Sequence, residues 1–304
     1  MPLAGTTSVI IVAADSGDGL LAGVRRVLAT DAPLRLIISD NASSDGSIGQ
    51  LQREFGTDAR LRIVYNGKNL GFGAGVNRAA VVAEGDCLLV LNPDCLIEDD
   101  TLARLRAQAL LPRTGVVGVR IQDDAGVDEP ASLRRDPTLR RSLCSLLRLD
   151  RFAARWPALA GVNVAAEAAQ RGEDCTAEAI SGALMLFPRD AFDAVGGFDE
   201  RFFLHCEDLD ICRRLRDAGY AVRYAGSIRV QHGKGGSSRH RPVFVAWHKH
   251  RGMWLWFRHH DAAARNPLLR GLVWAGIWTR FGLLLPLLLW RKWRHGRAGR
   301  QRAG

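Results

Sequence analysis

The chain has 304 residues, 47% of them hydrophobic, which is enough for one large α/β domain plus an appendage and more than a single small core needs. The six cysteines form no CxxC pair, and no basic flank or long apolar run at the N-terminus suggests an export signal. We therefore expect reduced thiols in a cytoplasmic protein rather than a disulfide framework. A zinc site is the alternative use of these thiols, although the usual ligand spacing is missing.

The net charge of +10 is unevenly distributed along the chain. From Arg239 onward there are 14 Lys and Arg residues and one acid, Asp261, whereas residues 1–238 carry 28 basic and 31 acidic side chains. We therefore predict a slightly acidic catalytic or binding body, residues 1–238, followed by a strongly basic extension, residues 239–304. Either an anionic membrane or a nucleic acid would attract this extension.

Short apolar runs alternate with helical patterns over the first 120 residues. Apolar runs without polar alternation indicate strands that are covered on both faces, and the strand–helix alternation indicates a mostly parallel sheet. The predicted strands are residues 8–13, 34–39, 61–65, 87–91 and 115–121, and the predicted helices lie near residues 19–29, 46–55, 74–84 and 99–110. Ligands of such sheets bind beyond the carboxyl ends of the strands.

The second half of the chain begins with weak signals. Residues 122–175 predict an irregular or helical excursion, and residues 179–187 predict a further strand. Residues 190–195 suit a short helix, and residues 207–218 suit an amphipathic helix. Residues 220–230 predict a final strand that leads to His232.

Two predicted strands end in polar sequences. The second strand runs into Asp40, and the fourth runs into Asn92, Pro93 and Asp94. A carboxylate at such a position can bridge a hard cation such as Mg²⁺ to substrate phosphates. Asn-Pro-Asp is also good turn chemistry, so a purely structural turn is the alternative at Asp94.

A glycine-rich stretch, residues 69–77, precedes the third predicted helix. Backbone amides at a helix start can face phosphate or other substrate oxygens. The stretch is not a dinucleotide-binding fingerprint, because Val76 stands in the place of the last glycine. Close packing of strand and helix explains the glycines equally well.

Acidic residues open the amphipathic helix, and a histidine follows the last strand. Glu207 and Asp208 suit a general base that takes a proton from an attacking hydroxyl, but acids in a first helical turn also stabilise the helix dipole. His232 precedes a loop at residues 233–238 that contains a lysine, and it suits a metal or diphosphate contact. A structural role is the alternative for His232.

Seven motifs occur along the chain in one order. They are DNASSDGS at residues 40–47, NLGFGAGVN at 69–77, LNPD at 91–94, SGALMLF at 181–187, GGFDERFF at 196–203, EDLDICRRLRDAGY at 207–220, and the loop at His232. Together they resemble the family 2 glycosyltransferases with a GT-A fold, most closely the bacterial rhamnosyltransferase-like branch. The resemblance extends from residue 8 to about residue 238.

The resemblance implies a fold and a set of site residues. The fold is α/β of the GT-A type, a mostly parallel Rossmann-like sheet flanked by helices, with a C-terminal helical, membrane-associating extension. The implied residues are Asp208 and Glu207 for catalysis, Asp94 and His232 for a divalent metal (Mg²⁺ or Mn²⁺), Asp40, Asn41, Asn69, Gly71, Asn77 and Asn92 for the donor, and Ser181, Gly182 and Ala183 for the acceptor. Asp40 is similar to the acid that recognises the pyrimidine base of the donor. The sequence departs from the family where Ala13, Ala14 and Asp15 replace a triplet that often carries an aromatic residue.

The resemblance also implies the reaction. A base deprotonates an acceptor hydroxyl, which displaces the nucleoside diphosphate from the anomeric carbon with inversion. The donor is a dTDP- or UDP-linked sugar, with rhamnose suggested by the branch, and the acceptor is a lipid-linked sugar or a cell-surface polysaccharide. A nucleotidyltransferase, which would release pyrophosphate, and a non-enzymatic nucleic-acid-binding protein that uses its basic tail are the alternatives.

The basic extension contains two apolar segments. Residues 243–260 mix aromatic side chains with cations, and residues 271–290 are apolar apart from Thr279 and Arg280. A membrane-spanning helix needs about 20 apolar residues, and a central arginine makes insertion costly. We therefore favour helices that lie on the anionic, cytoplasmic face of the cell membrane rather than on nucleic acid. Spanning the bilayer and packing on the catalytic body remain alternatives.

Overall fold

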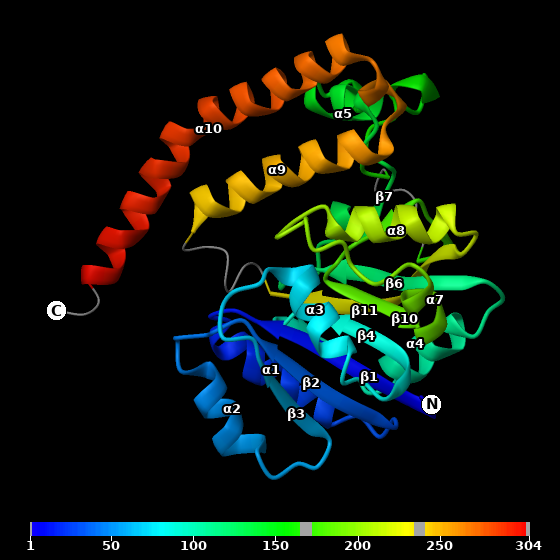
Figure 1. Ribbon diagram of the computed structural model, residues 1–304, viewed down its shortest axis with the longest axis vertical. Coiled ribbons are helices and arrows are strands. Elements are labelled where there is room, and N and C mark those ends of the chain that lie inside the picture. The colour runs from blue at the N-terminus through cyan, green and yellow to red at the C-terminus, as the bar shows by residue number, and fades with distance from the viewer. Residues whose placement is uncertain (1, 165–171, 234–240, 302–304) are drawn as a thin grey trace.

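The computed structural model describes residues 2–164, 172–233 and 241–301, and it describes side chains as far as residue 290. Residues 234–238 of the loop predicted at residues 233–238 therefore lie outside the described residues. A twisted sheet forms the centre of the molecule, and helices cover both of its faces (Figure 1).

The central sheet contains nine strands within the described residues, and eight of them follow the order β3-β2-β1-β4-β10-β6-β11-β5. The strands β3, β2, β1 and β4 are mutually parallel, whereas β10 runs antiparallel to both of its neighbours. The ninth strand, β8, pairs with β11, and β7 and β9 form a separate small sheet. The strands are β1 (Leu3–Ala13), β2 (Leu34–Asp40), β3 (Leu61–Tyr65), β4 (Gly85–Leu91), β5 (Cys95–Leu96), β6 (Thr114–Gln122), β7 (Leu133–Arg134), β8 (Asp174–Thr176), β9 (Ala179–Ile180), β10 (Leu184–Pro188) and β11 (Ala221–His232).

The helices divide between the two faces of this sheet. The helices are α1 (Gly17–Leu28), α2 (Ser47–Phe55), α3 (Phe72–Ala80), α4 (Thr101–Ala109), α5 (Leu139–Leu146), α7 (Arg189–Ala194), α8 (Glu207–Asp217), α9 (Pro242–His260) and α10 (Pro267–Gln301). Buried side chains of α1, α2 and α4 join one hydrophobic cluster, and those of α3, α7, α8 and α9 join the other. The chain therefore builds a three-layer α/β domain.

The strand β1 shows why the sequence reads as an unbroken apolar run. Val9 and Ile11 belong to the cluster under α1, whereas Ile10 and Val12 belong to the cluster under α3. Successive side chains of a strand point to opposite faces, so a strand with helices on both sides must be apolar at every position.

The predicted strand at residues 179–187 is not continuous. The chain pairs as β9 with β7, turns at Gly182, and then enters the central sheet as β10. This turn brings the Gly182 N–H to the carboxylate of Asp208, which is the physical reason for the break.

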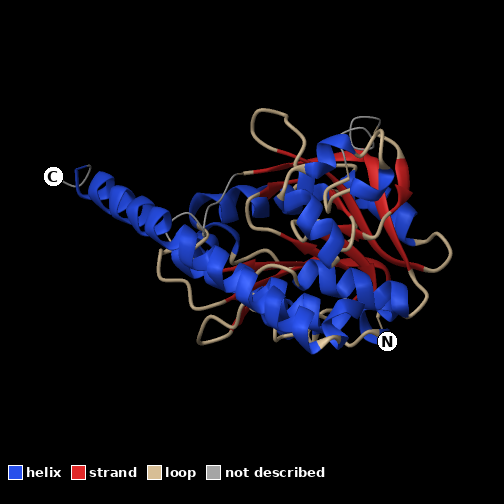
Figure 2. Ribbon diagram, turned by 90° about the horizontal axis from the view of Figure 1, so that it is seen from above, coloured by secondary structure: helices blue, strands red, loops and turns tan. Residues whose placement is uncertain are grey.

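The two C-terminal helices differ in their surroundings. Trp256 and Phe257 of α9 are buried, whereas the outer side chains of α10 are exposed. Figure 2 shows the end of α10 extending away from the body of the molecule. Among the described residues, one stretch, Pro267–Trp290 of α10, is long and apolar enough to cross a membrane by length and composition.

Candidate functional site

A cavity of about 320 Å³ lies where β1, β2 and β4 end. Asn41 follows β2, Asn92 and Asp94 follow β4, and His232 ends β11, so the ends of these three strands meet at the cavity walls with the start of α3. The predicted donor residues Asn69 and Gly71 line the same cavity. The structure therefore brings together polar residues as far apart in sequence as Asn41 and His232, at the edge where α/β sheets bind ligands.

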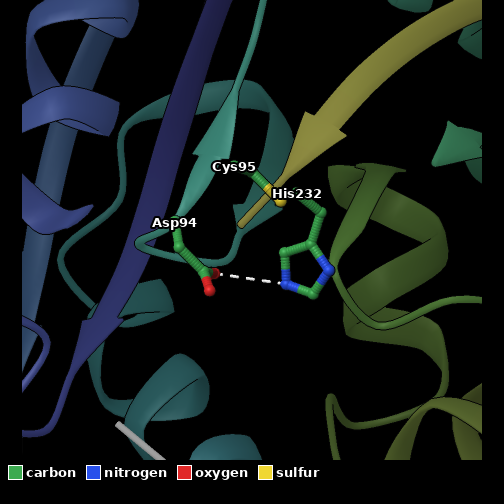
Figure 3. Close-up of side chains that lie close together, drawn as sticks. All are labelled: Asp94, Cys95 and His232. Atoms are coloured by element: carbon green, nitrogen blue, oxygen red, sulfur yellow. Dashed lines mark ion pairs between the residues drawn. The ribbon is translucent and has the colours of Figure 1, made fainter. Parts of the chain in front are cut away.

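Asp94 and His232 face one another across this cavity wall (Figure 3). The His232 Nε2 atom lies 3.2 Å from Asp94 Oδ1 and 3.2 Å from the amide nitrogen of Asn92. The other ring nitrogen, Nδ1, lies 3.1 Å from Glu129 Oε1. Glu129 therefore fixes the orientation of the ring from behind, as a carboxylate commonly does for a metal-binding histidine.

The two carboxylates control the charge of His232. Burial alone lowers the pKa of His232, but its hydrogen bonds with Asp94 and Glu129 outweigh burial and raise the pKa to about 10. His232 is then protonated at neutral pH when no cation is bound. A carboxylate and an imidazole beside an open cavity fit a divalent cation, which would leave room for ligands from a substrate.

Cys95 belongs to the same cluster, since its sulfur lies within 4.8 Å of the ligand atoms of Asp94 and His232. The thiol is fully buried and hydrogen bonds with the Ala183 carbonyl oxygen at 3.4 Å. Burial raises the pKa of the Cys95 thiol well above its usual range, and the charge of Asp94 raises it further. Zinc binds the thiolate form of cysteine, so a thiol that stays neutral is a poor zinc ligand. That leaves the Asp94 carboxylate and the His232 imidazole as donors, and carboxylate oxygens are ligands that Mg²⁺ and Mn²⁺ prefer.

The predicted donor residues hold the cavity wall in shape. The Asn41 side chain donates to the Gly71 carbonyl oxygen at 3.0 Å and to Asn69 Oδ1 at 3.3 Å. Gly71 has φ +90°, and a Cβ atom there would lie 2.5 Å from the Phe203 carbonyl oxygen. Only glycine fits at this position, because the backbone of the loop before α3 touches the backbone of the loop before α8.

Two predicted donor residues do not line the cavity. Asp40 is 5% exposed, and its carboxylate accepts a hydrogen bond from the Ser43 N–H at 2.9 Å. The Asn77 amide donates to the Phe198 carbonyl oxygen at 2.8 Å and accepts from the Phe198 N–H at 2.9 Å. Asn77 therefore joins α3 to the segment at residues 196–199.

Asp208 lies in the first turn of α8, held by three donors among the described residues. Its Oδ2 atom accepts from the Arg134 guanidinium and, at 3.1 Å, from the Gly182 N–H, while Oδ1 accepts from the Leu209 N–H at 2.8 Å. A carboxylate offers about four lone-pair positions, so one position on Oδ1 remains for an incoming hydroxyl. The Asp208 side chain is 15% exposed.

Glu207 has a different environment from its neighbour. The residue is 7% exposed, and its Oε2 atom has no hydrogen-bond partner among the described residues. Burial raises the pKa of Glu207 to about 8, with a further contribution from the charge of Asp208. Two adjacent carboxyl groups with different environments are a common basis for distinct catalytic roles.

The cavity and the Asp208 centre adjoin one another through the predicted acceptor segment. The Asn92 N–H donates to the Ala183 carbonyl oxygen at 2.9 Å, and the neighbouring Gly182 donates to Asp208. Because β10 is antiparallel to β4 with Leu184 paired to Leu91, the start of β10 lies at the carboxyl end of β4. The residues at Ser181–Ala183 thus connect the Asp94 side of the site to the Asp208 side.

The loop that enters α8 is strained. His205 and Cys206 have φ values of +68° and +71°, which cost non-glycine residues on the order of 1–3 kcal/mol each. The helix α9 covers this loop so closely that a Cβ atom at Gly252 would lie 2.6 Å from the His205 carbonyl oxygen. His205 lines the cavity, and burial lowers its pKa to about 4, so its ring is neutral.

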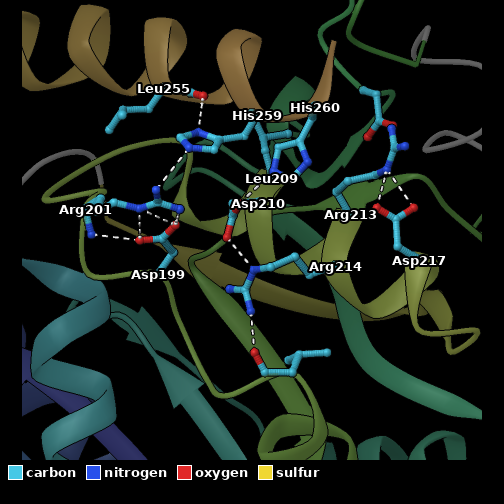
Figure 4. A network of polar contacts seen from close by, with 12 residues as sticks. Asp199, Arg201, Leu209, Asp210, Arg213, Arg214, Asp217, Leu255, His259 and His260 are labelled. Carbon is cyan, nitrogen blue, oxygen red and sulfur yellow. Dashed lines mark hydrogen bonds and ion pairs between the residues drawn. The ribbon is translucent and has the colours of Figure 1, made fainter. Parts of the chain in front are cut away.

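Polar contacts attach α9 to the helix that carries Asp208 (Figure 4). His260 Nε2 lies 2.7 Å from Asp210 Oδ1, and Arg214 donates to Asp210 Oδ2 at 2.7 Å. Arg201 pairs with Asp199 and lies 3.0 Å from a ring nitrogen of His259. At its other end, α9 supplies Phe244 and Val245 to the cavity wall, and Arg241, the residue before α9, also lines the cavity.

Several contacts of this candidate site were not foreseen from the sequence. Arg134 and Glu129 both lie in residues 122–175, where the sequence shows no clear secondary-structure pattern and none of the seven motifs. Aromatic side chains at the cavity come from Phe72, Phe203 and Phe244 rather than from the positions after β1. Because these contacts join segments that are distant in sequence, no local pattern identifies them.

The comparisons with known proteins agree with this geometry. Residues 8–171 match the model of glycosyl transferase family 2, and residues 163–295 match that of glycosyl transferase family group 2. The chain is 30% identical over 246 residues to the N-acetylglucosaminyl-diphospho-decaprenol L-rhamnosyltransferase of Mycobacterium tuberculosis (strain ATCC 25618 / H37Rv), covering 76% of this chain and 78% of that one. It belongs to glycosyl transferase family 2.

Other relatives of this family 2 glycosyltransferase extend the agreement. Rhamnosyltransferase WbbL of Escherichia coli (strain K12) is 26% identical over 235 residues, covering 74% of this chain and 82% of that one. Among solved structures, the mannosyltransferase PcManGT of Pyrobaculum calidifontis, in complex with GDP-Man and Mn²⁺, matches with a TM-score of 0.59 at 19% identity, covering 98% of this chain and 75% of that one. GalNAc-T7 with UDP, GalNAc and Mn²⁺ matches with a TM-score of 0.58 at 18% identity, and the match covers 76% of this chain but 44% of that one.

These findings confirm the predicted α/β GT-A fold, the rhamnosyltransferase-like branch and the assignment as a nucleotide-sugar-dependent glycosyltransferase. They set aside the alternatives of a nucleotidyltransferase and of a non-enzymatic nucleic-acid-binding protein. The boundary at residue 238 stays a prediction, and α9 packs on the body rather than apart from it.

Proposed function

We propose that this glycosyltransferase moves rhamnose from dTDP-rhamnose to a polyprenyl-diphosphate-linked sugar at the cytoplasmic face of the cell membrane. The observation that carries the proposal is the convergence of Asp94, His232 and Asp208 at one edge of the sheet, joined through Gly182 and Ala183. The M. tuberculosis relative is named for rhamnose and for an acceptor sugar linked to decaprenol, and the E. coli relative is named for the same transferred sugar.

Asp94 and His232 are the residues that would hold a divalent cation, and Asn92 would contact the donor beside them. Mg²⁺ or Mn²⁺ at this position would stabilise the negative charge that develops on the leaving diphosphate. Glu129 keeps the His232 ring in place, and the neutral His205 can hydrogen bond with substrate oxygens without adding charge.

Asp208 is the base that we assign to the reaction. The open lone pair of Oδ1 accepts the proton of the acceptor hydroxyl, whose oxygen forms a new bond to the anomeric carbon. The bond from that carbon to the diphosphate oxygen breaks on the opposite face, so the nucleoside diphosphate leaves and the configuration inverts. Arg134 and the Gly182 N–H hold Oδ2, which keeps Oδ1 directed toward the acceptor.

Glu207 suits a supporting role better than the role of base. Because its pKa is raised to about 8, Glu207 is mostly protonated at neutral pH and is a poor proton acceptor. Its protonated form also avoids a second buried negative charge next to Asp208.

The membrane part of the proposal rests on α10. The apolar stretch Pro267–Trp290 has none of its residues buried against the body, and the chain after it is rich in cations. Such a helix suits the interface of an anionic membrane, where apolar side chains enter the lipid and cations remain near the headgroups.

A nucleotide-sugar screen tests the proposal. Selective binding of a ligand to the folded state raises its melting temperature, so dTDP-rhamnose with Mn²⁺ should raise Tm more than UDP- or GDP-sugars do. Incubation with a polyprenyl-diphosphate-linked sugar should then release dTDP. Release of pyrophosphate, or protection by none of the nucleotide-sugars, would contradict the proposed function.

A further inference from the structure

A second exposed apolar surface lies away from the donor cavity, on the segment that follows β7. In α5 and the residue after it, Leu143, Leu146 and Leu147 occupy positions i, i+3 and i+4, and they are 47%, 60% and 63% exposed. A helix of a globular domain normally turns such a stripe toward the core. Here the buried position is Cys144, so α5 presents its leucines outward.

Aromatic side chains next to arginines continue this surface. Phe152 and Trp156 are 40% and 52% exposed, and their rings pack edge to face with centroids 6.1 Å apart. The Arg151 and Arg155 guanidinium groups lie over these rings, 4.6 Å and 5.5 Å from the centroids. Large aromatics with stacked arginines are typical of protein surfaces at the headgroup level of a membrane.

The charge of the segment has one sign. Residues 139–159 contain five arginines and one aspartate. Arg140, Arg148, Arg151 and Arg155 are exposed, so most of this positive charge faces solvent. Each cation near an anionic bilayer contributes about 1 kcal/mol, or roughly fivefold in binding.

The segment lies beside the start of α10. The Leu139 N–H donates to Asp261 Oδ2 at 2.6 Å, which ties the beginning of α5 to the linker between α9 and α10. Figure 1 shows α5 next to this end of α10. Leu268 and Leu272, in the first turns of α10, are 71% and 60% exposed. The apolar surface of residues 139–159 is therefore close to the apolar surface of α10.

We propose that Leu143, Leu146, Leu147, Phe152 and Trp156, here named the α5 surface, form a second contact with an anionic lipid bilayer beside α10. A bilayer fits better than a protein partner, because outward leucines, ring-stacked arginines and an adjacent exposed apolar helix of membrane-spanning length occur together. The proposal deepens the proposed function, on which it rests for the lipid-linked acceptor.

Docking through the α5 surface would bring the catalytic base close to the bilayer. Arg134, which holds Asp208, lies five residues before Leu139, and five extended residues span at most about 17 Å. The diphosphate and sugar of a lipid-linked acceptor extend from the bilayer surface into the same zone. A bilayer contact at α5 thus positions the acceptor hydroxyl with respect to Asp208.

Vesicle flotation of the full chain tests this contact. The variant carries Leu146→Asn, Leu147→Asn and Trp156→Ser, and the matched control carries Val81→Asn and Leu110→Asn, at positions that are 80% and 77% exposed elsewhere. On vesicles of phosphatidylcholine with phosphatidylglycerol, we expect at least about tenfold weaker binding for the variant and unchanged binding for the control. Equal binding of variant, control and wild type would overturn the proposal.

A fluorescent label on the α5 surface reports the lipid contact locally, in addition to the overall affinity that flotation measures. With the exposed thiol removed by Cys175→Ser, an environment-sensitive fluorophore is attached at Leu147→Cys and, as control, at Leu110→Cys. Anionic vesicles should shift the emission to shorter wavelength at position 147 and leave it unchanged at position 110. An unchanged emission at position 147 would overturn the proposal.

A water-soluble acceptor separates this proposal from the proposed function. The flotation variant should transfer sugar to a short-chain acceptor analogue at the wild-type rate and lose at least tenfold in rate with the lipid-linked acceptor in vesicles. Equal loss with both acceptors would overturn the role of the α5 surface. A wild-type enzyme that transfers to neither acceptor would sink the proposed function, whereas the vesicle experiments would still decide the lipid contact.

Discussion

The replacement Asp208→Asn probes the base and its partner Arg134 together. Removing a general base typically lowers turnover about 10²–10⁴-fold, equivalent to roughly 2.7–5.5 kcal/mol in the activation free energy. The same change leaves the buried Arg134 guanidinium without its carboxylate, which costs up to about 3–5 kcal/mol of folding stability. We therefore expect Asp208→Asn to lose both turnover and stability.

A double variant separates the two losses. Arg134→Met combined with Asp208→Asn removes the unpaired cation, and with it the free-energy penalty of a buried charge that has no partner. The double variant should regain most of the folding free energy in a denaturant titration but stay at least about 100-fold slow. Asp217→Asn, at the exposed end of α8, is the matched control and should keep both properties.

Single-turnover measurements at saturating donor complete this test. Donor affinity should change little in either variant, because Asp208 does not line the donor cavity. If either variant turns over at nearly the wild-type rate, Asp208 is not the base.

Two further predictions concern Phe244 and Glu207. Phe244→Ala should weaken donor binding in calorimetry by about tenfold, because aromatic stacking on a base is worth about 1–3 kcal/mol. Phe152→Ala, the control, should leave the donor affinity unchanged. An unchanged affinity in Phe244→Ala would exclude stacking of the donor base on Phe244. Glu207 has a folded-state pKa of about 8 against an ordinary value of 4.5, so the folded state binds the extra proton and wild-type stability falls as pH rises between these values. Glu207→Gln should remove this pH dependence, so that the free energies of unfolding of the two proteins change relative to one another by on the order of a few kcal/mol between low pH and pH 8. Parallel pH profiles of the two proteins would refute the raised pKa of Glu207.

The fold was largely predictable, because strands that helices cover on both faces appear in the sequence as unbroken apolar runs. A strand such as β4 must be apolar where helices cover both of its faces, as residues 87–91 are, and the helices between the strands show regular apolar spacing. The broken strand at residues 179–187 was predictable only in part. Its apolar residues indicate extended chain, but the turn at Gly182 depends on a hydrogen bond to Asp208 in a distant helix.

The residues of the candidate site that lie at strand and helix ends were predictable from the sequence. The residues that reach the site through contacts between distant segments were not. Motif positions indicated Asp94, His232 and Asp208, which the fold then gathers at one edge. Arg134 belongs to a two-residue strand, β7, whose partner β9 lies about 45 residues away, so its contact with Asp208 had no local signature. Likewise, the mixed aromatic and basic pattern of α9 suggested a membrane surface, but Phe244 and Trp256 contact the body.

Cation-dependent donor binding tests the central claim most directly. In calorimetric titrations of the nucleoside diphosphate, we expect Mn²⁺ to tighten binding to the wild type by at least about tenfold and to have no effect on Asp94→Ala, while the exposed control Asp124→Ala behaves as the wild type. Equal affinities with Mn²⁺ and with a chelator in the wild type, or full cation dependence in Asp94→Ala, would contradict the site described above.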